Sequence, residues 1–239
     1  MQIEMFEIAE RYCGPPRSGN GGYVCGRIAK HQQGTVAVRL SVPPPLNVEL
    51  RLESTATQAR LLHGSLLVGE AKSAQLDIEV PPSPSYEEAE AAVPSFLGFT
   101  THAFPGCFVC GPKRKAEDGL RIFPGPVDGS SLIAAPWTPD AELADETGNV
   151  KSEFLWSALD CTGAFSILPA LDDTAIVLGE LCATILGPVA PGDRCVVIGW
   201  PLNTTGRKHL AGTAVYTASG RLVAKARAVW IEVPSSTWA

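Results

Sequence analysis

The chain has 239 residues, of which 45% are hydrophobic and 18% are charged, and its formal net charge is -6. The length permits one large domain or two small ones with a sizeable core, and the acidic balance without a basic run argues against nucleic acid as a partner. No apolar run reaches the ~18 residues of a membrane helix, and the acidic N-terminal residues are unlike a signal peptide, so no membrane association is expected. The 7 cysteines lie among apolar neighbours and favour free thiols in a reducing cytoplasm, so we expect a cytoplasmic protein.

A glycine pair follows a loop rich in glycine and proline near the start of the chain. Asn20 is a predicted N-cap, and Gly21 and Gly22 open a helix that extends to about Gln33, where Gly34 is its predicted stop. Because glycine carries no side chain, a ligand oxygen can approach the first N–H groups of such a helix closely. A plain capped helix with a flexible entry is the structural alternative.

The rest of the first half is rich in β-forming residues. A tight turn is predicted at residues 63–65, an acidic and partly helical connector at 86–92, and a proline-bounded linker at 94–105. The predicted strands of this half are residues 6–12, 35–42, 48–57, 59–62 and 66–80.

The second half opens with Cys107 and Cys110 and contains one long apolar stretch. The spacing of its apolar residues predicts a single helix over residues 150–168 that is apolar nearly all round and therefore buried. Ser152 is its predicted N-cap, with Glu153 in the first turn, and Pro169 its stop. The predicted strands of this half are residues 120–123, 131–137, 175–186, 194–201, 209–217 and 222–233, with a hairpin turn at 218–221.

One carboxylate, Asp160, lies in the middle of this predicted helix. Asp is almost never fully buried without a partner or a task, so Asp160 is a candidate functional residue. A hydrogen bond from its side chain to nearby backbone is the structural alternative.

The two halves share one order of elements, a helix followed by about four strands, which suggests an internal repeat. The letters LVGEAK at 67–72 parallel LVAKAR at 222–227, and each copy leads to a strand that ends in Glu-Val-Pro. Two strands of similar composition can also match by chance.

Four segments resemble hot-dog-fold acyl-CoA thioesterases. SEFLWSALDCTGAF at 152–165 looks like the central helix of PaaI-type enzymes, with Asp160 where that family has its catalytic carboxylate. The Asn-Gly-Gly-Tyr run at 20–23 resembles the glycine-opened helix start of TesB-like thioesterases. Two further likenesses to hot-dog thioesterases are CFVCGP with GLRIFP, at 107–124, and GPVAPGDRCVVIGWP, at 187–201.

The resemblance implies an α+β double hot-dog, in which each half is an antiparallel sheet wrapped around a central helix. A shortened first unit would span residues 1–94, a linker 95–105, and the second unit 106–239. Because two units in one chain mimic the usual hot-dog dimer, we expect a monomer or a homodimer.

Each half departs from the family pattern in a different place. The second half has Lys-Ser-Glu at 151–153 where PaaI-type helices begin His-Gly-Gly, whereas the first half keeps Asn-Gly-Gly at 20–22 but has Ala29 near the carboxylate position. In hot-dog dimers the helix-start amides and the carboxylate come from different units. The resemblance therefore implies one complete composite site and one degenerate one.

The expected activity is hydrolysis of an acyl-CoA-type thioester. Asp160 would act as general base on water, or as a nucleophile, and the N–H groups of Gly21 and Gly22 would hold the oxyanion. Asn20 would orient the water or the acyl group. The expected partner is a small-molecule acyl thioester, with no cofactor beyond the CoA of the substrate and no assigned CoA-binding residues.

Two other functions fit the same resemblance: a non-catalytic acyl- or CoA-binding protein, and a hydratase or dehydratase of enoyl or 3-hydroxyacyl thioesters. The second would need a histidine beside the carboxylate, and none lies close to Asp160 in the sequence. No metal is expected at Cys107 and Cys110, because no second CxxC or paired histidine supplies the missing ligands. The four histidines, His31, His63, His102 and His209, show no metal-ligand spacing.

Overall fold

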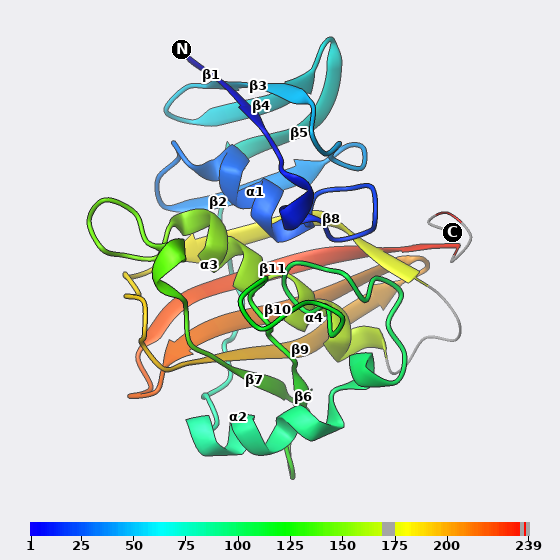
Figure 1. The fold of residues 1–239 in the computed structure, drawn as a ribbon, viewed down its shortest axis with the longest axis vertical. Helices are drawn as coiled ribbons and strands as arrows, with labels where there is room; N and C mark the ends of the chain where they lie inside the picture. Colours follow the sequence, from blue (N-terminus) through cyan, green and yellow to red (C-terminus); the bar gives the residue numbers. More distant parts are fainter. Residues whose placement is uncertain (169–174, 235–236, 238–239) are drawn as a thin grey trace.

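The computed structural model describes residues 1–168, 175–234 and 237, and its main feature is one antiparallel sheet that runs from top to bottom of Figure 1. The 11 strands follow the order β1-β3-β4-β5-β2-β8-β11-β10-β9-β7-β6. Those of the first half are β1 (Gln2–Glu7), β2 (Thr35–Leu40), β3 (Glu49–Ser54), β4 (Gln58–His63) and β5 (Leu66–Ser73). Those of the second are β6 (Gly125–Pro126), β7 (Ile133–Trp137), β8 (Ala175–Ile185), β9 (Cys195–Thr205), β10 (Lys208–Thr217) and β11 (Leu222–Val233).

The strands of the two halves join where β2 pairs with β8. Val38 of β2 lies opposite Leu181 of β8 in an antiparallel register, and both side chains are buried. At the end of this pairing, the hydroxyls of Thr35 and Thr184 hydrogen-bond at 2.7 Å. The sheets of the two halves therefore join edge to edge, and the junction is built from core residues.

The helices lie against this sheet. The helix α1 (Gly21–Ala29) packs on β2, β4, β5 and β8, while α3 (Ser152–Ala158) packs on α1, and α4 (Cys161–Ile167) packs on β9 and β10 (Figure 1). The helix α2 (Tyr86–Ala92) contacts β6, β7 and β9. Along β9, Cys195 and Val197 belong to the main core, whereas Val196 and Ile198 pack in a second cluster with Ala89 of α2. Because side chains alternate across a strand, α2 covers the opposite face of the sheet from α4.

No helix among the described residues is long and apolar enough to cross a membrane.

The first half follows the predicted order with shorter elements. Asn20 caps α1 as predicted, but α1 ends at Ala29 instead of near Gln33, and Gly34, at φ 73°, lies in the turn before β2. β1 is at Gln2–Glu7 instead of residues 6–12, and Glu10–Tyr12 form the short 3-10 helix η1. β5 ends at Ser73 instead of residue 80, because its partner β2 begins at Thr35 and offers no backbone further along.

The single helix predicted for residues 150–168 is wrong, because the structure divides it into α3 and α4. At the break, Asp160 has φ -85° and ψ -85°, which is outside the helical region. The Leu159 carbonyl just before it accepts a hydrogen bond of 2.8 Å from Thr213 Oγ1 on β10. This contact and the hydrogen bonds of the Asp160 side chain, described below, favour the break. The residues that make these bonds are all far from Asp160 in the sequence.

Three smaller predictions about this region have different outcomes. The N-cap of α3 is Lys151, one residue before the predicted Ser152, and Glu153 is in the first turn as expected. Pro169, the predicted stop, lies outside the described residues. Residues 120–123 form no strand of the sheet, since Leu120 N–H bonds to Phe108 O and Ile122 N–H to Val109 O.

The segment predicted as a linker packs on the core. It contains the 3-10 helices η2 (Val93–Ser95) and η3 (Leu97–Phe99), and the η4 helix (Ala141–Leu143) lies further on. Phe96 is 2% exposed, and its ring centroid lies 4.5 Å from that of Phe165 on α4. The unit boundaries at 94 and 105 stay predictions.

Candidate active site

Asp160 lies at the break between α3 and α4 and is 2% exposed. Its Oδ2 accepts a hydrogen bond of 2.9 Å from the Gly22 N–H and one of 2.8 Å from Asn20 Nδ2. The carboxylate of the second half is therefore held by the helix start of the first half, across 138 to 140 residues of sequence. The proximity predicted for these two fragments is found.

Two glycines of α1 allow this contact, because they let α1 approach α3 closely. A Cβ added at Gly22 would lie 2.6 Å from Asp160 Cβ and 2.6 Å from the Trp156 carbonyl oxygen. One turn later, a Cβ at Gly26 would lie 2.5 Å from Glu153 Cα. Spacing of four residues places both glycines on one helix face. This spacing indicates close helix packing. We interpreted Gly22 in the sequence as a place for a ligand to approach and did not consider packing.

Asn20 has two functions at this junction. Its Oδ1 accepts the Tyr23 N–H at 2.9 Å and so caps α1, while its Nδ2 donates to Asp160. Asn20 is itself 2% exposed. The side-chain amide predicted to orient water or the acyl group thus orients the carboxylate of Asp160.

The expectation that Gly22 holds an oxyanion needs correction, because the Gly22 N–H already donates to Asp160 Oδ2. The Gly21 N–H has no hydrogen-bond partner among the residues that the structure describes, and Gly21 lines the cleft. A Cβ at Gly21 would lie 2.8 Å from the Leu178 side chain, so β8 also approaches the helix start closely. Gly21 therefore has the N–H group at this helix start that no described residue uses.

Two opposing effects act on the pKa of Asp160. Burial raises the pKa of Asp160 to about 7, although the hydrogen bonds from Gly22 N–H and Asn20 Nδ2 favour the carboxylate. The N-terminal end of the α1 dipole also favours the negative charge. Within the described part of the chain, Oδ1 is buried and has no hydrogen-bond partner. Oδ1 is thus the oxygen of Asp160 that no described group holds, and Asp160 itself lines the cleft described next.

A cleft of about 810 Å³ adjoins these groups. Its volume falls in the range of small-molecule sites, which are mostly apolar with a few polar groups that fix the ligand. The polar groups include Asn20 and Asp160, and the apolar ones come from both halves of the chain. Among the latter are Leu40, Val42, Leu97, Phe104, Phe165, Leu178 and Trp230.

Three buried cysteines lie beside Asp160. The Sγ atoms of Cys107, Cys110 and Cys161 all lie within 4.8 Å of one another, and Asn20 Nδ2 is 3.7 Å from Cys107 Sγ. Hydrogen bonds from the thiols of Cys110 and Cys161 hold the pKa of Cys107 well below its ordinary value. We expected no metal because Cys107 and Cys110 had no further ligands near them in the sequence. Cys161 is a further thiol at this place, and it is 54 residues from Cys107, so sequence spacing could not indicate it.

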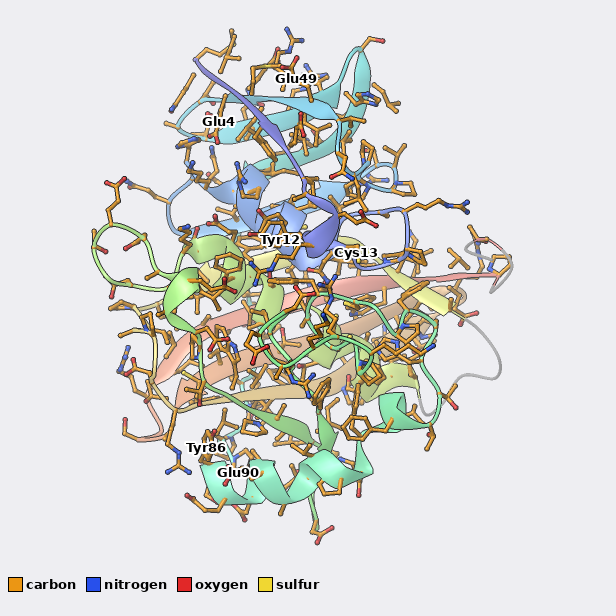
Figure 2. The ribbon with its side chains drawn as sticks, in the orientation of Figure 1. Glu4, Tyr12, Cys13, Glu49, Tyr86 and Glu90 are labelled. Atoms are coloured by element: carbon orange, nitrogen blue, oxygen red, sulfur yellow. The ribbon has the colours of Figure 1, made fainter. Side chains whose placement is uncertain are left out.

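Aromatic rings close the junction on the side of α1. Tyr12 stacks on Tyr23 with centroids 4.2 Å apart and meets the edge of Phe108 at 5.0 Å. Figure 2 shows Tyr12 and Cys13 beside α1, and the Cys13 carbonyl accepts the Phe108 N–H at 2.7 Å. The loop that carries Cys107 and Cys110 is thereby fixed to the first half of the chain.

Comparison with known proteins supports the architecture. Neither a protein-family model nor a curated protein matches the sequence. The structure of a TesB protein from Mycobacterium avium subs paratuberculosis matches at TM-score 0.66 and 12% identity, over 97% of this chain and 93% of that one. An acyl-CoA thioesterase II, TesB2, from Mycobacterium marinum matches at TM-score 0.63 and 12% identity, over 99% and 94%.

A third matched structure is described by name as having the hot dog fold. It is a protein of unknown function with a hot dog fold from Alicyclobacillus acidocaldarius, at TM-score 0.54 and 9% identity, over 97% of this chain and 93% of that one. This chain has a double hot-dog fold. The fold class predicted from the four sequence segments is therefore confirmed, and in this double hot-dog Asp160 lies where residues of the two halves meet.

Proposed function

We propose that this double hot-dog protein hydrolyses an acyl-CoA-type thioester at the composite site, with Asp160 as general base. One observation carries the proposal: a buried carboxylate from the second half is held by the α1 start of the first half beside a largely apolar cleft. Two of the matched structures are named as thioesterase II or TesB proteins, which supports this reaction class.

Each group at the site has one step in this reaction. Asp160 Oδ1 takes a proton from a water molecule whose oxygen attacks the thioester carbonyl carbon. The Gly21 N–H stabilises the negative charge on the carbonyl oxygen, assisted by the α1 dipole. The tetrahedral intermediate then collapses, the C–S bond breaks, and the leaving thiolate takes up a proton to give free thiol and carboxylic acid. Asn20 and the Gly22 N–H keep Oδ2 engaged, which leaves Oδ1 for the water molecule.

The test is the Asp160→Asn variant with a panel of acyl-CoAs and steady-state thiol release. The remaining amide oxygen can still accept from Gly22 and Asn20, so the fold should persist, but the amide cannot take a proton. We expect turnover to fall by about 100- to 10,000-fold, the usual contribution of a general base. Asp128→Asn is the matched control, because Asp128 is exposed and lies in a loop far along the chain from the site.

The outcomes separate the proposed function from its alternatives. Unchanged turnover in Asp160→Asn with normal thermal melting would refute the catalytic role of Asp160. Binding of acyl-CoA without thiol release in the unmodified protein would identify a non-catalytic binding protein. Loss of enoyl-CoA absorbance without free thiol would identify a hydratase, although no described histidine hydrogen-bonds to Asp160.

The proposed site needs no second chain, since both halves of this chain contribute to it. A monomer or homodimer in the cytoplasm, acting on a small-molecule thioester without an organic cofactor, accordingly stays our prediction. Size measurement in solution tests the first point.

A further inference from the structure

The three cysteines beside Asp160 come from two distant segments that meet at one point. Cys107 and Cys110 belong to the loop after the predicted linker, and Cys161 is the first residue of α4. All three side chains are at most 7% exposed, and all three residues line the cleft. The proposed thioester hydrolysis uses none of these thiols.

The spacing of the sulfur atoms matches that of a thiolate metal centre. Cys107 Sγ and Cys161 Sγ are 3.7 Å apart, and Cys110 Sγ lies within 4.8 Å of both. A tetrahedral Zn²⁺ ion with Zn–S bonds of about 2.3 Å requires S···S separations of about 3.8 Å. The sulfurs are therefore already near the positions of three ligands and would need little movement to bind one ion.

The loop around Cys107 is a tight turn closed by backbone hydrogen bonds. The Cys107 N–H bonds to the Phe104 carbonyl at 2.9 Å, and the Gly111 N–H bonds to the Cys107 carbonyl at 2.9 Å. A Cβ at Gly111 would lie 2.5 Å from that carbonyl oxygen. The turn thus fixes the backbone between Cys107 and Cys110, so two of the three sulfur atoms are positioned by one short loop.

We propose that Cys107, Cys110 and Cys161 form a trithiolate site for a soft divalent metal ion of the Zn²⁺ class, with its fourth position toward the cleft. Binding forms three metal–sulfur bonds and releases one proton from each of the three groups that is still a thiol, so it involves no change of oxidation state. The open position would take a water molecule or a ligand atom that enters the cleft. None of the three ligands is a residue of the proposed thioester hydrolysis, and the metal site does not depend on that function.

Two polar neighbours support the thiolates without binding the ion. His102 Nδ1 accepts the Phe104 N–H at 3.0 Å, so its proton is on Nε2, which lies 3.2 Å from Cys110 O and 3.4 Å from Cys110 Sγ. A ring nitrogen that carries a proton cannot bind a metal, and His102 is therefore a hydrogen-bond donor to the site. Asn20 Nδ2 lies 3.7 Å from Cys107 Sγ and 3.8 Å from Cys161 Sγ, on the side of Asp160.

The experiment uses the full chain, reduced, freed of metal with a chelator and kept without oxygen. Co²⁺ is added as a spectroscopic probe, and Zn²⁺ is then added in competition. We expect one Co²⁺ per chain with sulfur-to-metal charge-transfer absorption, displaced by one equivalent of Zn²⁺. Replacing a residue that only hydrogen-bonds to a metal ligand typically weakens metal binding by about 10- to 100-fold. Cys161→Ser removes a ligand itself, so it should weaken Zn²⁺ binding by at least that much.

The matched control is Cys182→Ser. Cys182 is also a buried cysteine, but its Sγ lies 3.9 Å from the Gln75 carbonyl oxygen and outside the cluster. A serine hydroxyl can still donate to that oxygen, so this variant should bind Zn²⁺ as the unmodified protein does.

A protection measurement keeps the proposal falsifiable if Cys161→Ser does not fold. The unmodified protein is alkylated with and without Zn²⁺ and analysed by mass spectrometry, with the half-buried Cys13 as internal control. Zn²⁺ should protect Cys107, Cys110 and Cys161 but not Cys13. No Co²⁺ charge-transfer band, no protection of the three thiols, or equal binding by folded Cys161→Ser would overturn the proposal.

Discussion

Gly22 decides how closely α1 can approach α3. In Gly22→Ala the new methyl would lie 2.6 Å from the Trp156 carbonyl oxygen and from Asp160 Cβ, neither of which is the mobile end of a side chain. We expect a stability loss of about 1–3 kcal/mol, typical of overpacking, together with reduced thiol release because Asp160 is displaced. Denaturant unfolding and acyl-CoA turnover measure the two effects.

The control for this variant is Gly106→Ala. A Cβ at Gly106 meets nothing within 4 Å, and this glycine is not among those with positive φ. It should leave stability unchanged or raise it slightly, since alanine reduces the freedom of the unfolded chain. Equal stability of the Gly22 and Gly106 variants would contradict the close packing of α1 and α3.

Asn20 and Asp160 form a hydrogen-bonded pair of an amide and a carboxylate, and the two side chains can be swapped by mutation. Asn20→Asp keeps an acceptor for the Tyr23 N–H but places two carboxyl groups at a contact that is now 2.8 Å, which should destabilise the fold. Adding Asp160→Asn restores one donor to the pair, so the double variant should regain stability, with a coupling energy of about 0.5–3 kcal/mol, yet stay inactive. The four proteins of this double-mutant cycle are compared by denaturant unfolding, and additive losses would show that the two side chains are independent.

At the scale of elements, the break between α3 and α4 depends on β10. Thr213→Val removes the hydroxyl that donates to the Leu159 carbonyl at 2.8 Å and leaves that carbonyl buried without this partner. We expect a loss of about 1–3 kcal/mol and a lower kcat, because Asp160 follows Leu159 directly. Thr162→Val is the matched control: Thr162 Oγ1 is buried and has no partner within the described residues, so the change should be neutral or stabilising. Similar melting of the two variants would contradict a role for Thr213 in shaping the break.

At the scale of the whole molecule, the shared β2–β8 pairing and the α1–α3 contact predict that both halves unfold together. The 5 tryptophans all belong to the second half of the sequence, and the 4 that the structure describes, Trp137, Trp156, Trp200 and Trp230, are buried there. Their fluorescence therefore reports that half, whereas far-ultraviolet circular dichroism reports both. The two denaturant curves should coincide, as a two-state transition requires. A circular dichroism phase that fluorescence lacks would show independent halves.

The sequence by itself determined the fold class, most element positions and the identity of the two site fragments. The resemblance of four segments to hot-dog thioesterases implied the fold class and the two site fragments. Local spacing predicted the Asn20 cap, the hairpin at 218–221 and the amphipathic runs, because these act over a few residues. It also indicated Asp160 as a functional candidate, since a lone carboxylate in an apolar stretch needs a partner.

Only the tertiary structure decided what those residues do to one another. In the folded chain the Gly22 N–H donates to Asp160 and not to an oxyanion. The Thr213 hydroxyl donates to the carbonyl at which the predicted helix breaks. Cys161 lies beside Cys107 and Cys110. Each of these contacts joins residues more than 50 positions apart. Such pairs leave no periodicity or spacing in a single sequence, because their distance is fixed by the sheet order and by the packing of α1 against α3.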